Sequence, residues 1–183
     1  MIFTSELAGF DTANYALEPM TDADAPELLA HLSDPAVTEY MDILPLETLE
    51  QALAVIAWAG DIHGSGTGVR FAIRARDGGA FLGSAGFNSL VQERGCRGEI
   101  AYDLGQAWWG KGVMAEVLPA LIDMGFRRLG LQRLEAMVTP GNVRSCRLLE
   151  RHGFAAEGVL RDYGFWKDQF YDQIVYGRVA SAA

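Results

Sequence analysis

Hydrophobic and polar positions change their period between Glu99 and Leu129, the stretch around which the chain is organised. Residues 98–105, GEIAYDLG, alternate in polarity and end at a glycine, which predicts a strand. From residue 113 onward the apolar positions follow helical spacing, which predicts a helix; they are Met114, Val117, Leu118, Leu121, Met124 and Leu129. The QAWWGKG segment between them predicts a glycine-punctuated turn.

The same patterns predict the other elements. Helices are expected after an N-cap at Thr21 until Ser33-Asp34-Pro35, from Glu47 to Trp58, and from Val143 to His152 between an Asn142 cap and Gly153. Strands are expected at residues 15–20, 69–76, 80–90, 133–139, 154–163 and 169–178. Turns are expected at Asp77-Gly78-Gly79 and at 94–98, and an exposed loop at 60–68.

This order of elements predicts a single α/β (α+β) domain over residues 1–183, with a mainly antiparallel mixed sheet. Gly83 and Gly86 indicate a bulge or a close backbone approach within their strand. Pro119 falls inside the central helix, where it removes a backbone hydrogen bond, so we expect it to kink or shorten that helix.

The turn before the central helix predicts a site for a phosphate group. Unpaired backbone N–H groups at a helix start, together with the helix dipole, attract anions. Gly110 and Gly112 would let a ligand approach the backbone because they carry no Cβ.

Three ligands are compatible with this turn. Residues 105–112 resemble a Walker A loop, but Gly112 stands where Mg²⁺ needs Ser or Thr. Gly110, Gly112 and Ala115 fit a Rossmann fingerprint with Glu135 as its acidic residue, although no second βαβ half follows. The third ligand is the diphosphate of an acyl-coenzyme A. The turn alone leaves these alternatives, and an ordinary strand–helix connection, open.

Composition narrows the class of protein. The chain has 183 residues, half of them apolar, and a net charge of −9, which disfavours nucleic acid and suits an amine-bearing partner. We expect a cytoplasmic protein with no membrane span, and Cys96 and Cys146 form no disulfide framework. No metal is expected, because the histidines are scattered; they are His31, His63 and His152.

Two segments together carry a family resemblance: WWGKGVMAE, and about 30 residues later LEAMVTPGNVRSCRLLERHGFAAEGVLRD. They resemble the GNAT superfamily of N-acetyltransferases, in the branch of the ribosomal-protein N-terminal acetyltransferases (RimJ/RimL-like). The resemblance extends over nearly the whole chain. It implies the GNAT fold, with about six or seven strands flanked by helices and a splayed central strand pair.

The resemblance also implies that acetyl-CoA is the cofactor and that the turn holds its diphosphate. The family signature Q/R-x-x-G-x-G/A falls on residues 109–114, so Gly112 is the matching glycine, while Trp109 and Met114 depart from the pattern. The cradle should therefore rest on the backbone amides of residues 110–115, which are Gly110, Lys111, Gly112, Val113, Met114 and Ala115. Lys111 either adds a point charge to a phosphate or remains solvated.

The implied reaction is direct attack of a primary amine on the acetyl thioester. Glu99 is the expected general base, and Glu135 is the second candidate for this role. The alternative for Glu99 is a purely structural role, in which it forms an ion pair with an arginine at the end of its strand. The family places a backbone N–H near Leu104 against the acyl oxygen. Asn142 and Ser145 match the N-x-x-S of the branch, which implies a contact of Asn142 with the pantetheine arm and of Ser145 with the thiolate.

Aromatic residues are candidates for the walls of an acceptor site. Tyr40, Tyr163 and Trp166 are the expected substrate contacts, although aromatic residues on a hairpin more often pack across strands. The acceptor is a peptide or protein N-terminus or a small-molecule amine, and a homodimer is expected only by analogy. The alternative function is a non-catalytic acyl-CoA-binding regulatory module on the same fold.

Overall fold

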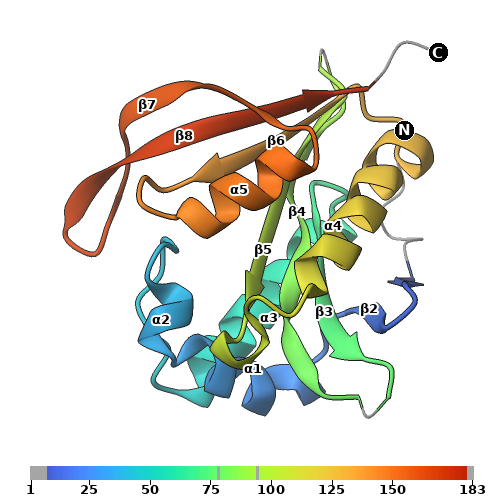
Figure 1. The fold of residues 1–183 in the computed structure, drawn as a ribbon. Helices are drawn as coiled ribbons and strands as arrows, with labels where there is room; N and C mark the ends of the chain where they lie inside the picture. Colours follow the sequence, from blue (N-terminus) through green and yellow to red (C-terminus); the bar gives the residue numbers. More distant parts are fainter. Residues whose placement is uncertain (1–7, 78, 94, 181–183) are drawn as a thin grey trace.

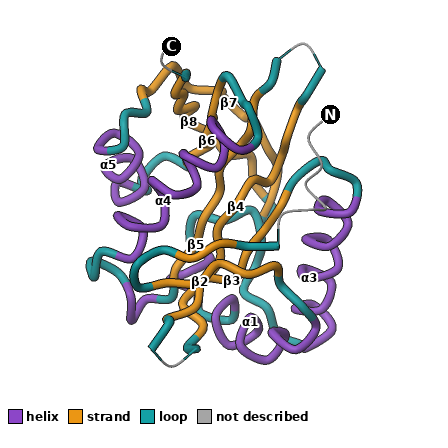
Figure 2. Tube along the Cα trace, turned by 90° about the vertical axis from the view of Figure 1, so that its right-hand side faces the viewer, coloured by secondary structure: helices purple, strands orange, loops and turns teal. Residues whose placement is uncertain are grey.

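An eight-stranded sheet carries helices on both of its faces (Figures 1 and 2). The computed structural model describes residues 8–77, 79–93 and 95–180. The strand order is β1-β2-β3-β4-β5-β6-β8-β7. The strands are β1 (Phe10–Asp11), β2 (Tyr15–Pro19), β3 (Val69–Ala75), β4 (Phe81–Val91), β5 (Arg97–Leu104), β6 (Arg133–Val138), β7 (Ala155–Trp166) and β8 (Gln169–Val179). The helices are α1 (Ala25–Leu32), α2 (Pro35–Thr38), α3 (Leu49–Gly64), α4 (Val113–Asp123) and α5 (Val143–Arg151), with short turns η2 (Asp22–Asp24), η3 (Gln106–Trp108) and η4 (Met124–Arg128).

The predicted α+β architecture with a mixed, mainly antiparallel sheet is confirmed. The strand that the sequence did not predict is β1, whose two residues pair with β2 at Leu17 and Ala16 and are too few to show an alternation. The predicted turns at 77–79 and 94–98 connect antiparallel neighbours, but the second is shorter than predicted, because Arg97 and Gly98 already pair with β4. Gly78 and Arg94 lie outside the described residues.

The strands β5 and β6 diverge at the centre of the sheet. They pair in parallel only where Arg97–Glu99 face Arg133–Glu135, whereas β5 continues to Leu104 on β4 and β6 continues to Val138 on β8. The expected splayed strand pair is therefore present. Backbone groups on the facing edges of the two strands are left without a strand partner beyond Glu99.

Two apolar clusters hold the layers together. The larger lies between the sheet and α4, and it includes Phe71, Phe87 and Leu118, all fully buried. The smaller lies under α1 and α3 on the opposite face, around Leu28 and Ile56 (Figure 2). The helices thus sandwich the diverging strands from both sides.

The expected close approach within β4 is also present. A Cβ at Gly83 would lie 2.2 Å from the Asp103 carbonyl oxygen, and one at Gly86 would lie 2.0 Å from that of Val69. Neither position has room for a side chain, and the register of β4 also shifts next to Gly83, where Gly83 pairs with Ile73 but Phe81 with Arg74, as at a bulge.

One prediction about a helix limit is wrong. The second helix, α3, ends at Gly64 and not at Trp58, because its buried face continues through Ala59, so the predicted loop at 60–68 begins only at Ser65. Pro119 lies inside α4, and the α-helix ends at Asp123, before Leu129, the last apolar position of the predicted helical pattern; the π-helical turn η4 follows. The residue whose carbonyl Pro119 cannot bond, Ala115, is exposed, so water can replace the missing donor.

Candidate active site

The loop before α4 presents an open, glycine-lined backbone. Gly110 and Gly112 have φ values of 72° and 85°, in the left-handed region that favours glycine, and a Cβ at either would meet no atom within 4 Å. Gly112 is the N-cap of α4 and receives no side-chain cap. The first amide that bonds back to it is that of Glu116, at 3.2 Å. The amides of residues 113–115 therefore lack helical partners, which is the arrangement that a diphosphate requires.

The side chains after the loop point away from it. Val113 and Met114 are buried in the main core, with 1% and 7% of their surfaces exposed. The departure of Met114 from the family signature is thereby explained, because its side chain fills the core and not the cradle. Both residues would meet a ligand only through their backbone.

Trp109 organises the start of the loop. Its indole Nε1–H donates to the Leu104 carbonyl oxygen at 2.8 Å, and the guanidinium carbon of Arg144 lies 4.1 Å from the ring centroid. Lys111 makes a similar contact with Trp108, its Nζ lying 5.0 Å from the ring centroid. Each of the two tryptophans that precede Gly110 thus holds one cation on its ring.

Leu104 directs its backbone toward the diverging edge of β5. The Gly105 N–H donates to the Leu82 carbonyl oxygen at 2.8 Å. Because hydrogen-bonded and non-hydrogen-bonded pairs alternate along an antiparallel ladder, Gly105 and Asp103 direct their N–H groups toward β4, and Leu104 between them does not. The N–H of Leu104 therefore faces the side on which β6 has separated. This orientation fits the expected role of a donor to an acyl oxygen.

Asn142 and Ser145 meet at the start of α5, as the sequence predicted. The Asn142 side-chain oxygen accepts from the Ser145 amide at 3.2 Å and caps the helix. The Ser145 hydroxyl lies 2.8 Å from the hydroxyl of Tyr102 on β5. Burial raises the pKa of Tyr102 to about 12, so this phenol keeps its proton at neutral pH. Sequence analysis missed Tyr102, because only the fold brings β5 and α5 together.

Glu99 lies at the point where β5 and β6 separate. Burial raises the pKa of its carboxyl group, and the carboxylates of Glu135 and Asp42 raise it further. Glu135 is held by Arg133, 2.7 Å from its carboxylate, and by Arg97 at 3.4 Å, whereas Glu99 forms no salt bridge with any described residue. Glu99 is therefore better suited than Glu135 to accept a proton.

The three aromatic candidates for acceptor contacts occupy different places. Tyr40 approaches the turn before α5, since a Cβ on Gly141 would lie 3.2 Å from its ring, and the Tyr40 carbonyl accepts from Thr139 at 3.1 Å. Trp166 stacks on Tyr171 at 4.5 Å. Tyr163 is 55% exposed on the edge strand β7, and no described contact links it to Glu99 or Ser145.

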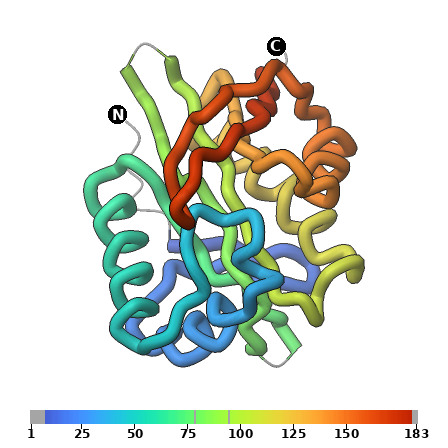
Figure 3. Tube along the Cα trace, turned by 90° about the vertical axis from the view of Figure 1, so that its left-hand side faces the viewer, coloured from blue at the N-terminus to red at the C-terminus, as the bar shows by residue number. Residues whose placement is uncertain are grey.

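The segment after α2 is tied to the hairpin formed by β7 and β8. Lys167, in the hairpin turn, donates to the carbonyl oxygens of Thr38 and Glu39 at 2.7 and 3.3 Å. Figure 3 shows the tip of this hairpin beside the segment that follows α2. This contact places Trp166 and Tyr40 on the same side of the molecule.

A buried ionic network lies on the α1 face of β5. The Asp103 carboxylate contacts His31 Nε2 at 2.6 Å, the Arg70 guanidinium at 2.8 Å and the Ser84 hydroxyl at 2.6 Å. Burial alone would raise the pKa of Asp103, but its partners His31, Arg70 and Ser84 together lower it to about 2. The network holds α1 against the strand that carries Glu99.

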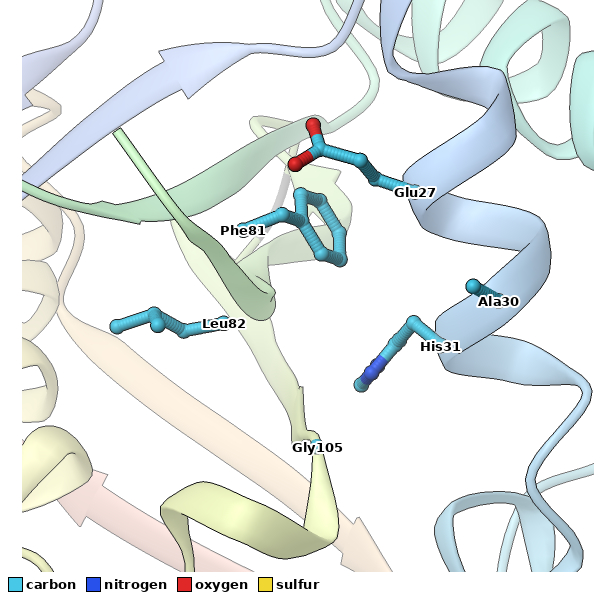
Figure 4. Close-up of a pocket in the computed structure, with 6 residues that line it drawn as sticks. All are labelled: Glu27, Ala30, His31, Phe81, Leu82 and Gly105. Atoms are coloured by element: carbon cyan, nitrogen blue, oxygen red, sulfur yellow. The ribbon is translucent and has the colours of Figure 1, made fainter. Parts of the chain in front are cut away.

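A cavity of about 290 Å³ lies beside this network (Figure 4). Its lining consists of Glu27, Ala30, His31, Phe81, Leu82 and Gly105. None of these residues is among the candidate site residues. Within the described ranges, no group of His, Cys, Asp and Glu could hold a metal ion, and none of the helices is long and apolar enough to cross a membrane.

Comparison with known proteins yields close relatives in sequence. The acetyltransferase (GNAT) domain family matches residues 15–155. An uncharacterised N-acetyltransferase of Bacillus licheniformis, p20, is 41% identical over 165 residues, which cover 90% of this chain and 92% of that protein. The [ribosomal protein uS5]-alanine N-acetyltransferase of Escherichia coli is 34% identical over 119 residues, covering 63% of this chain and 61% of that protein.

Solved structures share the fold. RimJ of Mycobacterium smegmatis, in complex with CoA-disulfide, superposes with a TM-score of 0.84 at 18% identity, covering 94% of this chain and 87% of that chain. The family match, the sequence relatives and the shared fold agree with the splayed strands and the glycine loop. The chain belongs to the GNAT family of acetyltransferases.

Proposed function

We propose that this protein transfers an acetyl group from acetyl-CoA to a primary amine by direct attack. One observation carries the proposal: the left-handed glycines 110 and 112 leave open space in front of uncapped amides, beside the strand edge at Leu104. A diphosphate bound there would lie at the end of the gap between β5 and β6.

The chain's own residues divide the binding of acetyl-CoA between them. The loop amides hold the diphosphate, except that of Lys111, which donates to the Trp108 carbonyl oxygen at 3.4 Å. The amide nitrogen of Asn142, its second hydrogen-bonding group, contacts the pantetheine arm. The acetyl thioester supplies the carbonyl carbon that the amine attacks. The Leu104 N–H stabilises the negative charge that develops on the acyl oxygen.

On the acceptor side, Glu99 removes the proton that the amine loses as the C–N bond forms. An α-amino group has a pKa near about 8 and a lysine near about 10, so a nearby base is needed at neutral pH. The raised pKa of Glu99 brings its basicity closer to that of the amine.

On the donor side, Ser145 donates a hydrogen bond to the sulfur as the C–S bond breaks. Tyr102 keeps its proton and its hydroxyl lies 2.8 Å from that of Ser145, so it can donate to the Ser145 oxygen, which leaves the serine hydrogen for the sulfur. Tyr102 is thus a positioning residue, because it acts through Ser145. The thiolate finally takes up a proton from solvent.

The acceptor that we propose to test first is a peptide α-amino group. The Escherichia coli relative is named for an alanine of a ribosomal protein, and Glu99, Glu135 and Asp42 favour a positively charged acceptor before its deprotonation. Tyr40 and Trp166 are proposed walls of this site, and Tyr163 a contact for a longer peptide. Small-molecule amines are tested as acceptors in the same assay.

The test measures release of free CoA thiol from acetyl-CoA with α-amino peptides, polyamines and aminosugars as acceptors. Amine-dependent release, with the acetylated product identified by mass spectrometry, is the expected result. Tight CoA binding without transfer to any amine would instead identify a non-catalytic acyl-CoA-binding module. Binding of ATP or NAD in preference to CoA would contradict both.

A further inference from the structure

The phosphate loop carries a tryptophan where the GNAT signature has glutamine or arginine. Trp109 has no charge to offer a phosphate, and its only polar hydrogen already donates to the Leu104 carbonyl oxygen at 2.8 Å. The loop therefore lacks the side chain that this position supplies in the signature. A cation from elsewhere in the fold lies on the ring of Trp109.

That cation is Arg144, in the first turn of α5. Its guanidinium carbon lies 4.1 Å from the Trp109 ring centroid, within the range of a stacked cation–π contact. The side chain is exposed and forms no salt bridge with any described carboxylate. An arginine in this position is held in place by the ring but keeps its hydrogen-bond donors available.

The surroundings of Arg144 place it at the opening of the proposed coenzyme site. It follows Asn142 by two residues and precedes Ser145 by one, and Trp109 directly precedes Gly110. Burial and Glu39 raise the pKa of Tyr40, while the charge of Arg144 opposes them, so the guanidinium also lies near the phenol that packs on Gly141. In a chain with a net charge of −9, this is a local positive site.

We infer that Arg144, stacked on Trp109, binds a phosphate of the coenzyme and replaces the arginine or glutamine absent from position 109. The inference rests on the proposed function, since it needs CoA in the loop. Guanidinium groups bind phosphate oxygens through paired hydrogen bonds. The bound phosphate is either the diphosphate held by the loop amides or the 3′-phosphate of the adenosine.

The test measures the Kd of CoA and of 3′-dephospho-CoA by calorimetry for the full chain and for R144Q. R151Q is the matched control, because it removes the same charge at the far end of the same helix. We expect R144Q to weaken CoA binding by about tenfold or more, and R151Q by less than about twofold. An equal loss for both ligands assigns the diphosphate, and a loss confined to CoA assigns the 3′-phosphate.

If the wild type binds CoA and R144Q binds it with the same Kd, the role of Arg144 is overturned and the proposed function is not. Failure of the wild type to bind CoA would overturn the proposed function and this inference with it. W109A tests the positioning by the ring. R144Q should weaken binding much less in a W109A background than in the wild type, and equal losses in both backgrounds would contradict that positioning.

Discussion

The pKa of the Glu99 carboxyl group is raised by burial and by the neighbouring carboxylates of Glu135 and Asp42, which the fold brings near it. Glu99 lies where β5 and β6 separate, and Glu135 beside it is ion-paired with Arg133 and Arg97. From the sequence, Glu99 is the expected base and Glu135 the second candidate, but the arginine partners of Glu135 are visible only in the structure. These ion pairs give a physical reason for preferring Glu99 over Glu135 as the base.

Replacing Glu99 with Gln should remove the acid limb of the pH profile of kcat/KM when KM is expressed for the unprotonated amine, since the ionisation of the amine itself is then taken out of the profile. In the wild type, activity should rise through the pKa of Glu99, which lies above the ordinary glutamate value of about 4.3, because only the ionised carboxylate accepts a proton. E99Q should lower the rate by about 100-fold at neutral pH.

Glu135→Gln is the control for this pH profile. It should keep the acid limb but move it to lower pH, because a charge that raises the pKa of Glu99 has been removed. If the pH profile of E99Q shows the same acid limb as that of the wild type, Glu99 is excluded as the base.

Tyr102→Phe should slow turnover by about tenfold and change the KM for acetyl-CoA little, because it leaves Ser145 without its orienting partner. Steady-state kinetics of Y102F, S145A and the double variant check this. The double variant should be no slower than S145A, since Tyr102 acts only through Ser145. Multiplied losses would show that Tyr102 has a separate role.

At the scale of the element, the loop from Gly105 to Gly112 was the part of the site that the sequence predicted best. Its glycines, the following helical pattern and the N-x-x-S of α5 are local signals, and each is found where expected. The helix ends were less predictable, because Gly60 and Pro119 are exposed positions where a helix tolerates unfavourable residues. Their effect depends on burial, which the local pattern does not contain.

Gly112→Ala should weaken CoA binding by about tenfold and destabilise the protein by about 1 kcal/mol, because φ is 85° at this position. Calorimetry with CoA and urea unfolding measure the two effects. Gly60→Ala is the control, since Gly60 lies within α3 and its added Cβ would meet nothing within 4 Å. G60A should stabilise by about 0.5 to 1 kcal/mol and leave the Kd unchanged. Equal CoA affinity in G112A and the wild type would remove Gly112 from the site.

At the scale of the whole molecule, long-range contacts join elements that local patterns treat separately. Asp103 connects α1 through His31 to β3 through Arg70 and to β4 through Ser84. Nothing in the strand pattern around Asp103 identified these partners, which lie 19 to 72 residues away in the chain. The fold class was predictable because it follows from element order and a family resemblance, whereas this network and β1 follow from tertiary packing.

Asp103→Asn should lower the free energy of unfolding at pH 7 by about 3 kcal/mol, because it leaves Arg70 and His31 buried without their carboxylate. The folded pKa of about 2 lies below the unfolded value of about 3.9. The ionisation of Asp103 therefore stabilises the folded wild type by on the order of 2 kcal/mol above about pH 4. This contribution is lost as the pH falls toward 2.

Urea denaturation between pH 7 and pH 3 measures the difference in free energy of unfolding between the wild type and D103N. This difference should become smaller as the pH falls. Asp123→Asn removes an exposed ion pair with Arg127 and should cost less than about 1 kcal/mol. A constant gap between D103N and the wild type across this range would contradict the assigned ionisation of Asp103.

The most direct test of coenzyme binding at the glycine loop is a titration of the ¹⁵N-labelled protein with CoA, followed by the chemical shifts of its backbone amides. We expect the largest changes on residues 110–115 and on Leu104, with little change along the outer strand β7. Largest changes elsewhere, with the amides of residues 110–115 unmoved at saturation, would contradict binding at this loop.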